Sequence, residues 1–545
     1  MTPARRTAAN RRGPIGARRV LARAAAASEP AGVSTEAPNA ADLVADLHER
    51  AARIRTEMGG AAKIARLRER GGRTVRDRID ELVDPGSFRE LGTFTRSKRP
   101  EDRHDTPGDG KIGGHATIDG RPVVVFGDDV TVRQGSSSTV GSRKEERLTE
   151  HAYHHGTPIV HLGETGGGRI PDILGAEGIS EIVPFPLLGT RNHQVPLATV
   201  IVGKSFGGSS FLSAMSDFTV QVRGSCLAVT SPRVFEVATG EIIGYEELGG
   251  VDVHARHTGQ IDLGVDTDAE AWDAVRRWLS YLPPNAWNPA PRAEPAGVVA
   301  ADPAIGEVVP AGRTRGYDVR RLLARVADEG SLFELRPDIG RNTTTALCRL
   351  DGWTLGVIAT NPMFGAGAID ADGCEKATRL LVLCDSFNIP VLFVQDVPGY
   401  LVGRQAEHAR LLYKAMRFRQ ALSLASCPTI TLVTRKAFGL AFKSMNGAGM
   451  GADAIYAWPG AEIGFMDPDV AVNVLRPEAT EDERRELMAE LAEATSPYDA
   501  AGVLQIDEVI DPAATRQVLA HDLARLAGRR VPPPAARPLS YWPTC

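Results

Sequence analysis

The chain repeats itself at a fixed distance, and this repeat restricts the folds that it can adopt. Residues Lys204-Ser205-Phe206-Gly207-Gly208 return as Lys436-Ala437-Phe438-Gly439-Leu440, an offset of 232 residues (436 − 204 = 232). Three further pairs keep the same offset: Gly120 and Gly352, Lys144 and Lys376, and Pro158 and Pro390. Anchors that stay in register over this length predict two copies of one domain in tandem.

The length agrees with this duplication. At 545 residues the chain exceeds what one hydrophobic core usually organises. The prolines and alanines that follow Leu282 predict a linker between the copies. We expect four parts: a disordered basic tail over 1–40, a first domain over 41–285, a linker over 286–315 and a second domain over 316–545.

The pattern of apolar residues predicts the class of each copy. Between Asp42 and about Arg70, apolar residues at helical spacing alternate with Arg and Glu, which predicts one or two surface helices. Further along, short apolar strands alternate with helical patterns in both copies. This alternation is typical of βαβ units with parallel strands, so the predicted fold class is α/β.

Charge and cysteine content exclude several functions. The net charge is −5, so we expect no nucleic-acid partner and no attraction to anionic membranes. No apolar run reaches the roughly 20 residues that a membrane-spanning helix needs. The six Cys lack metal-ligand spacing, and His151, His154 and His155 lie on a predicted helix without a second ligand cluster. No metal site is expected.

The first residues differ from the rest of the chain. They are rich in Arg, and no acidic residue precedes Glu29. We interpret them as a basic tail on a cytoplasmic protein. The alternative is an organellar transit peptide, which would direct the chain to the mitochondrial matrix.

Glycine-rich turns follow the predicted strands and lead into predicted helices. The first copy has Thr165-Gly166-Gly167-Gly168 and Phe206-Gly207-Gly208-Ser209; the second has Val397-Pro398-Gly399 and Phe438-Gly439-Leu440-Ala441. Such a turn leaves backbone N–H groups free and directed at one point. They can hold an anion or polarise a carbonyl as its oxygen gains charge. The alternative is an ordinary βα turn that needs Gly for its positive φ.

Longer motifs relate the chain to a known family. The segments that carry the likeness are Arg78-Ile79-Asp80, Asp84-Pro85-Gly86-Ser87-Phe88, Gly166-Gly167-Gly168-Arg169, Glu246-Glu247-Leu248-Gly249-Gly250, Asn361-Pro362, Cys384-Asp385-Ser386-Phe387-Asn388-Ile389-Pro390, Asp396-Val397-Pro398-Gly399-Tyr400 and Arg435-Lys436-Ala437-Phe438-Gly439. Together they resemble the carboxyltransferase β subunits of biotin-dependent acyl-CoA carboxylases, such as those that act on propionyl-CoA or acetyl-CoA.

The resemblance implies a fold, an activity and partners. The fold is a tandem pair of crotonase-like (ClpP/crotonase) ββα-superhelix domains, usually assembled as a hexamer in which the N domain of one subunit faces the C domain of another. The activity is transfer of a carboxyl group from carboxybiotin to the α-carbon of an acyl-CoA. Carboxybiotin would be carried by a partner α subunit with biotin carboxylase and biotin carrier functions, because this chain has no Met-Lys-Met attachment sequence.

The resemblance also implies the residues of the site. The catalytic groups would be two pairs of backbone N–H groups. One pair would stabilise the thioester enolate and the other the ureido oxygen of biotin. The pairs fall on Gly208 and Ser209, and on Leu440 and Ala441. Residues on the CoA and acyl side would be Gly166, Gly167, Gly168, Arg169, Gly207 and Lys443. Residues on the biotin side would be Asn361, Pro362, Ala366, Gly367 and Gly439.

Three positions depart from the family pattern. Leu440 stands where a second glycine is usual, and a positive φ there would be costly. Phe206 adds bulk before the first turn. Lys443 lies at a position linked in the family to acyl-chain selection; it could pair with a carboxylate of the substrate, or it could point into solvent.

These departures leave two alternatives open. The first is a biotin-independent acyl-CoA decarboxylase or carboxyl transferase, which would use the same enolate. The second is a non-catalytic β-like subunit in a mixed oligomer. The intact glycines of the first copy disfavour the second alternative, since a structural subunit has less need of them.

Overall fold

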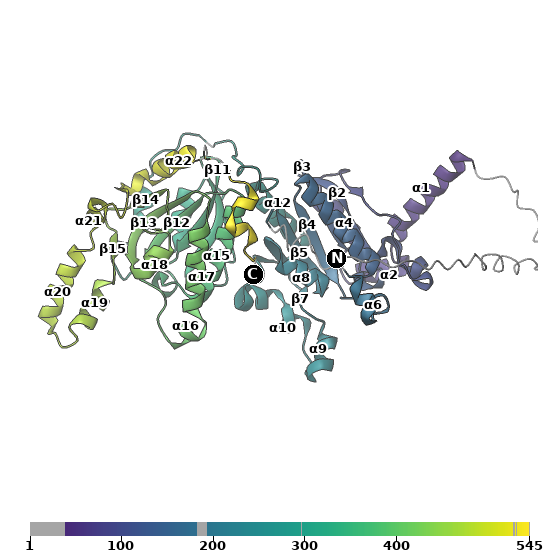
Figure 1. Ribbon diagram of the computed structural model, residues 1–545, viewed down its shortest axis with the longest axis horizontal. Helices are drawn as coiled ribbons and strands as arrows, with labels where there is room; N and C mark the ends of the chain where they lie inside the picture. The colour runs from purple at the N-terminus through teal and green to yellow at the C-terminus, as the bar shows by residue number, and fades with distance from the viewer. Residues whose placement is uncertain (1–38, 183–192, 296, 527–528, 530, 544–545) are drawn as a thin grey trace, which may run out of the picture. The chain divides into compact units, whose positions relative to one another are not determined.

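The structure, a computed structural model, describes residues 39–182, 193–295, 297–526, 529 and 531–543 (Figure 1). The expected tail over 1–40 lies almost wholly outside the described residues. Two compact units are present. The first, residues 1–52, is described only as most of helix α1 (Ala40–Glu57), and the second, residues 53–545, contains both sheets.

The first sheet combines an antiparallel edge with a parallel centre. Its strands follow the order β1-β2-β3-β4-β5-β6-β8, and β7 pairs with β5. β2 is antiparallel to both of its neighbours, β1 and β3, and the remaining pairs are parallel. The bounds are β1 Arg89–Glu90, β2 Lys111–Ile118, β3 Arg121–Asp128, β4 Ile159–Thr165, β5 Leu197–Phe206, β6 Phe218–Val222, β7 Cys226–Ala228 and β8 Leu263–Val265.

The second sheet repeats this topology. Its strands follow the order β9-β10-β11-β12-β13-β14-β16, and β15 pairs with β13. The bounds are β9 Phe333–Leu335, β10 Thr343–Leu350, β11 Trp353–Thr360, β12 Val391–Val397, β13 Thr429–Phe438, β14 Ala454–Ala457, β15 Glu462–Gly464 and β16 Glu508–Val509. The strands of the two sheets form separate groups in Figure 1, blue to teal and then green.

The offset seen in the sequence is kept residue by residue in the strands. Adding 232 to the bounds of β2, β3, β4 and β5 gives the bounds of β10, β11, β12 and β13. Even the irregularity between β4 and β5, where Thr165 pairs with Ser205, recurs as Val397 with Ala437. The central strands are buried on both faces, as expected for parallel strands covered by helices. The predicted α/β duplication is confirmed.

The two lysines matched by the offset have the same structural role. Lys144 and Lys376 are both buried, and each lies on the long helix that precedes the second parallel strand of its sheet. Lys144 Nζ donates to Lys111 O (2.6 Å), and Lys376 Nζ donates to Arg336 O (2.9 Å). Each ammonium therefore ties its helix to the backbone at or before the first long strand of its sheet.

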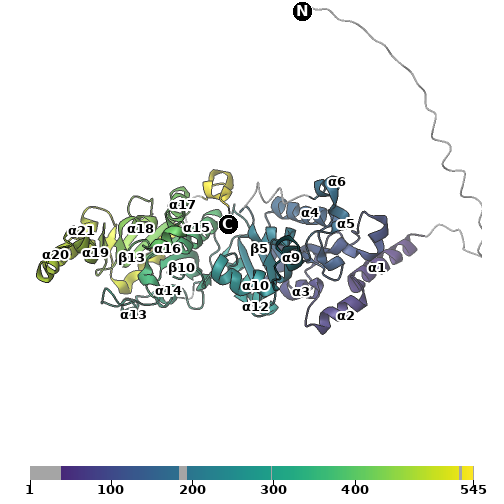
Figure 2. The same cartoon turned by 90° about the horizontal axis from the view of Figure 1, so that it is seen from below.

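Helices cover both faces of the sheets. In the first half α4 packs on β2 and β3, and α12 packs on β5 and β6; in the second half α15 and α17 pack against each other (Figures 1 and 2). The helices of the first half are α2 Ala61–Glu69, α3 Val75–Leu82, α4 Thr139–His155, α5 Ile170–Ile173, α6 Gly175–Ser180, α8 Gly208–Ala214, α9 Pro232–Thr239, α10 Tyr245–Gly249, α11 Val251–Val253 and α12 Asp268–Tyr281. Those that follow are α13 Ala304–Glu307, α14 Val319–Val326, α15 Ala371–Ser386, α16 Arg404–His408, α17 Leu411–Leu424, α18 Gly439–Ser444, α19 Pro468–Leu475, α20 Glu481–Glu493, α21 Pro497–Gly502 and α22 Thr515–Leu526.

The surface helices expected between Asp42 and Arg70 are present as α1 and α2, neither of which has a buried residue. Over the described ranges, no helix has the length and apolar character needed to cross a membrane. The domain boundaries expected at residues 285 and 316 stay predictions.

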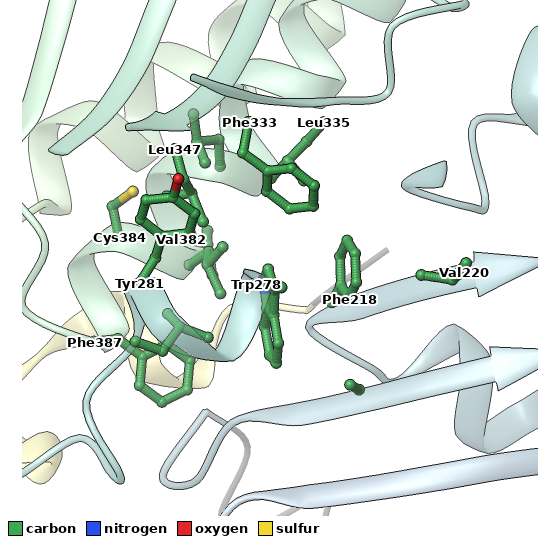
Figure 3. Packing of buried hydrophobic residues seen from close by; sticks show 14 of the residues in the cluster. Phe218, Val220, Trp278, Tyr281, Phe333, Leu335, Leu347, Val382, Cys384 and Phe387 are labelled. Carbon is green, nitrogen blue, oxygen red and sulfur yellow. The ribbon is translucent and has the colours of Figure 1, made fainter. Parts of the chain in front are cut away.

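One hydrophobic cluster joins the two halves. Phe218 of β6 stacks on Trp278 of α12, with ring centroids 5.1 Å apart, and contacts Phe333 of β9 at 6.0 Å. Figure 3 shows these rings directed toward one another, with Tyr281 and Leu347 beside them. The cluster contains buried residues of both sheets, so each half completes its core with side chains of the other.

Candidate functional site

The first glycine turn joins β5 to α8. Gly207 has φ +63° and ψ −125°, a conformation that favours glycine. The first hydrogen bond of the helix runs from Phe211 N to Gly207 O (3.0 Å). The N–H groups of Gly208 and Ser209 therefore have no partner inside the helix, and both lie at its start, where backbone donors face outward.

The second turn joins β13 to α18 in the same way. Gly439, the first residue of α18, has φ +62°, within a degree of Gly207, and Leu440 and Ala441 follow it in the first turn of the helix. Leu440 itself does not have a positive φ, so the strain expected for this side chain is absent. The positive φ falls on Gly439, and the Leu440 side chain is 42% exposed. Leu440 keeps its N–H group without distorting the turn.

The two turns of the first half form one wall. A Cβ placed on Gly207 would lie 3.7 Å from Gly167 Cα, and one on Gly208 would lie 3.6 Å from Ser137 Oγ. Gly166 N donates to Gln134 O (2.9 Å), which fixes the Gly166 turn to the segment after β3. The structure thus brings together the first-half glycines that the sequence predicted.

Phe206 does not crowd this wall. Its side chain is buried, and its ring stacks on Tyr245 at 6.3 Å. The bulk that the sequence predicted before the first turn is directed into the protein.

Arg169 holds the glycine loop from within. Its guanidinium is buried and donates to Asp109 Oδ1 (2.5 Å) and to the backbone oxygen of Ser136 (3.2 Å). With these partners the side chain stiffens the loop, and it has little capacity left for a ligand. Arg169, which was predicted for the CoA side, therefore stabilises the conformation of the glycine loop.

Residues predicted for the biotin side also meet in the second half. Asn361 Nδ2 donates to Asp318 Oδ1 (3.0 Å), and Asn361 Oδ1 accepts from Met363 N (3.2 Å). A Cβ on Gly367 would lie 2.5 Å from Asp396 O and 3.7 Å from Pro362 Cα, so only glycine fits there. Ala366, beside it, has φ +53°. Asn361, Pro362, Ala366 and Gly367 therefore form a close-packed loop, in which the Asn361 amide is used internally.

Lys443 lies against its own loop. Its Nζ donates to Ala448 O (2.7 Å) and lies 5.4 Å from the centroid of the Phe442 ring. The side chain is half-buried. The structure therefore holds this ammonium on a backbone carbonyl of its own loop.

A large cleft opens beside the first glycine wall. It has a volume of about 1480 Å³ and extends from α2 to the ends of β4, β5 and β6 and the start of α12. Lys63 and Arg66 of α2 and Arg70, the residue that follows it, line the cleft, and none of the three forms an ion pair with a described residue. Unpaired cations on a concave surface attract phosphate groups.

These cations were not predicted from the sequence. Lys63, Arg66 and Arg70 recur at intervals of three and four residues, the spacing of one helix face, and this was the available signal. Which cavity this helix face lines depends on how α2 packs against the strand ends, and the sequence alone does not give that packing.

An ion cluster around the buried Arg78 lines this cleft. Arg78 of α3 pairs with Glu164 at the end of β4 and with Asp268 Oδ2 (3.0 Å) at the start of α12. It also donates to Val202 O (3.2 Å) in β5. Burial raises the pKa of Glu164, and the charge of Arg78 opposes this rise. The cluster fixes the strand ends from which the glycine turns begin.

A smaller pocket of about 310 Å³ adjoins the cleft at the Gly166 turn. Gly168, Ile170 and Pro171 line it. Arg133, Gln134 and Gly166 line both cavities. The arrangement can hold a long anionic molecule whose charged end lies in the cleft and whose carbonyl lies at the glycine wall.

Comparison with known proteins agrees with this geometry. A family model described as "Carboxyl transferase domain" matches residues 66–537. The propionyl-CoA carboxylase carboxyltransferase subunit of Haloferax mediterranei is 38% identical over 490 residues, covering 87% of this chain and 94% of that protein. The methylmalonyl-CoA decarboxylase subunit alpha of Veillonella parvula is 32% identical, covering 89% and 96%.

A solved structure is similar over almost the same length. The transcarboxylase 12S hexamer with methylmalonyl-coenzyme A and methylmalonic acid bound superposes with a TM-score of 0.86 at 33% identity, covering 91% of this chain and 98% of that one. With a family match over most of its length and relatives above 30% identity, the chain belongs to the carboxyl transferase family.

Proposed function

We propose that the chain is the carboxyltransferase subunit of a biotin-dependent acyl-CoA carboxylase. The observation that carries the proposal is the pair of matched turns: Gly207 and Gly439 have φ values within a degree of each other, and each precedes two N–H groups with no partner inside their helix. Two carbonyl substrates need two such sites. Membership of the carboxyl transferase family supports the same activity.

On the acyl-CoA side, the N–H groups of Gly208 and Ser209 bind the thioester oxygen. As the α-carbon loses its proton, negative charge moves onto this oxygen, and fixed donors stabilise it more than they stabilise the starting thioester. The enolate carbon then forms a bond to CO2, which gives the carboxylated acyl-CoA. The chain itself therefore supplies charge stabilisation and position, with no nucleophilic side chain.

On the biotin side, the N–H groups of Leu440 and Ala441 bind the ureido oxygen. They fit this role because they are unpaired within α18 and Gly439 keeps the turn tight. When bound there, carboxybiotin would supply the CO2 and a nitrogen base for the α-proton. Donors at the ureido oxygen stabilise the charge that develops there as the carboxyl group leaves.

The cleft beside the first turn binds the CoA portion. Lys63, Arg66 and Arg70, which form no ion pair with a described residue, suit the phosphates of the nucleotide. Propionyl-CoA and acetyl-CoA are the first substrates to test. Lys443 remains our candidate for acyl selection, since a substrate carboxylate could displace its contact with the Ala448 carbonyl.

We also propose that the chain acts in a hexamer, or in a mixed oligomer with a second β subunit, together with a biotin-carrying α subunit. The transcarboxylase 12S relative was solved as a hexamer. Both halves of this chain expose large apolar side chains that an assembly could cover: Val229, Val237 and Ile242 in the first, and Val402, Phe465 and Leu475 in the second. An N domain of one subunit would then face the C domain of another.

The test is carboxylation in a complete system. The purified chain is combined with a biotinylated α subunit, ATP, labelled bicarbonate and a panel of acyl-CoAs. We expect acid-stable label in the acyl-CoA product, dependent on both proteins. Absence of label with every acyl-CoA, from a chain that still binds CoA, would contradict the proposal. The preferred acyl-CoA then serves to test Lys443→Met, for which we expect a changed preference among the panel.

A second function has one observation in its favour. The relative from Veillonella parvula is named as a decarboxylase subunit, at 32% identity. Decarboxylation uses the same enolate and the same N–H groups of Gly208 and Ser209. CO2 release from malonyl-CoA or methylmalonyl-CoA by the chain alone, without biotin, would favour this second function.

A further inference from the structure

The segment after β3 adopts a backbone conformation that is costly for its residues. Arg133, Gln134 and Gly135 have φ values of +48°, +58° and +64°. The matched segment of the second half, Gly365-Ala366-Gly367, has φ values of +54°, +53° and +79°. The second copy makes this left-handed turn with glycines and the smallest side chain, whereas the first makes it with two long side chains. A left-handed φ is unfavourable for any residue with a Cβ.

Gln134 lies where the two cavities of the first half meet. It lines both the cation-bearing cleft and the smaller pocket. Its carbonyl accepts from Gly166 N (2.9 Å), and a Cβ built on Gly166 would lie 3.3 Å from both Gln134 Cβ and Gln134 Oε1. The side chain therefore extends along the glycine turn. It is exposed, and its amide forms no hydrogen bond with any described residue.

Strained backbone that carries an unpaired polar side chain is typical of a binding site. If Gln134 served the fold alone, a glycine or an alanine would make the same turn at lower cost, as Ala366 does in the second half. The strain at Gln134 therefore points to a role for its side chain beyond the turn.

We infer that the side-chain amide of Gln134 binds the pantetheine arm of the acyl-CoA. The inference rests on the proposed function. The Gly166 turn lies against Gly207 through Gly167 and lines both cavities beside Gln134, so a thioester held at the Gly208 and Ser209 N–H groups, with its phosphates in the cleft, would run along it. The intervening arm carries secondary amides, each with one donor and one acceptor. A glutamine amide has both and can pair with either.

Two substitutions separate binding from folding. Gln134→Met keeps the length and the backbone strain but removes the hydrogen-bonding atoms. Gln134→Gly removes the side chain and relieves the strain. The probes are coenzyme A and 4′-phosphopantetheine, titrated calorimetrically into the purified full chain, with thermal unfolding measured in parallel. Phosphopantetheine contains the arm but lacks the adenine nucleotide.

We expect both variants to bind both probes about 2- to 10-fold more weakly, the loss that corresponds to one neutral hydrogen bond. We expect Gln134→Gly to unfold at a temperature about 1–3 °C higher than the wild type, because strain is relieved. Leu504→Gly is the matched control. Leu504 has φ +54° on an exposed residue of the second half, so its replacement relieves similar strain and leaves probe binding unchanged.

Each other outcome overturns the inference in a distinct way. If Gln134→Met binds both probes as the wild type does, the amide makes no contact with the arm. If it weakens coenzyme A but not phosphopantetheine, the contact is with the nucleotide. If the wild type binds neither probe, the proposed function fails, and the inference fails with it.

Discussion

At the scale of single residues, adjacent positions in each N–H turn have different backbone requirements. Gly207 and Gly439 carry the positive φ, so neither tolerates a side chain without strain. The next residues, Gly208 and Leu440, each lie in the first turn of a helix. A departure from the family pattern at Leu440 therefore leaves the N–H geometry of the second turn intact.

This difference predicts opposite results for neighbouring substitutions. Gly207→Ala should lower the free energy of unfolding by about 1–3 kcal/mol and lower carboxylation, because the strained backbone shifts the N–H groups. Gly208→Ala should change the free energy of unfolding by less than about 1 kcal/mol, since Leu440 is tolerated at the matched position. Urea titration of both variants provides the comparison. Equal destabilisation by both would contradict this account of the turn.

A second residue makes stability depend on pH. His161 lies in β4 with no exposed surface, and burial, with a smaller effect of the Lys111 charge, lowers its pKa to about 3. In the unfolded chain a histidine has a pKa near 6.5. Below that pH the unfolded chain binds a proton that the folded chain does not, so stability falls as pH falls from about 6.5 towards 3.

His161→Gln should remove this dependence. Between pH 7.5 and pH 5 the wild type should lose about 2 kcal/mol more than the variant in the free energy of unfolding, at about 1.4 kcal/mol per pH unit below 6.5. Urea titrations at several pH values give both curves. Parallel curves for the two proteins would show that His161 does not titrate as its burial requires.

At the scale of elements, the repeat predicts where the strands lie, whereas the roles of other residues depend on long-range contacts. The offset of 232 maps β2 to β5 onto β10 to β13, but β6 begins at Phe218 and β14 at Ala454, an offset of 236 (454 − 218 = 236). The pairing order survives this insertion, although the sequence register does not. Sequence patterns predicted the glycine turns because local backbone chemistry determines them. The cations of α2 and the Gln134 amide were missed, since their roles depend on which strand ends they meet.

The C-terminal segment makes long-range contacts that no local sequence pattern predicts. Arg537 is fully buried and donates to backbone oxygens of three separate segments: Ala286 (2.6 Å), Ser386 (2.6 Å) and Pro532 (2.9 Å). It thereby joins the residues after α12, the end of α15 and the C-terminal segment.

Arg537→Met should lower the free energy of unfolding by about 2–4 kcal/mol, because it leaves several buried carbonyls without donors. Arg529→Met is the control. Arg529 is about half exposed and pairs with Asp453 at 3.3 Å, so its loss should cost less than about 1 kcal/mol. Urea titration measures both. If Arg537→Met lowers the free energy of unfolding no more than Arg529→Met does, Arg537 does not hold the three segments together.

At the scale of the whole molecule, the two halves share one core. Trp278 of the first half has no exposed surface, and its cluster includes Phe333 and Leu347 of the second. Duplicated domains that complete each other's cores should unfold together.

Calorimetry tests this coupling. The wild type should unfold in one transition, and Trp278→Ala should lower the free energy of unfolding by about 3–5 kcal/mol while keeping one transition. Two resolved transitions, of which only the first responds to Trp278→Ala, would mean that the halves are energetically independent.

The central claim is that two matched N–H turns serve two substrates, an acyl-CoA and biotin. The most direct measurement is the reverse reaction of the chain alone: CO2 release from methylmalonyl-CoA or malonyl-CoA, with and without free biotin. The account predicts that free biotin accelerates release, because biotin accepts the carboxyl group at the Leu440 and Ala441 turn and then loses it as CO2. Release at one rate regardless of biotin would contradict the claim and support the decarboxylase, and no release in either condition would contradict carboxyl transfer altogether.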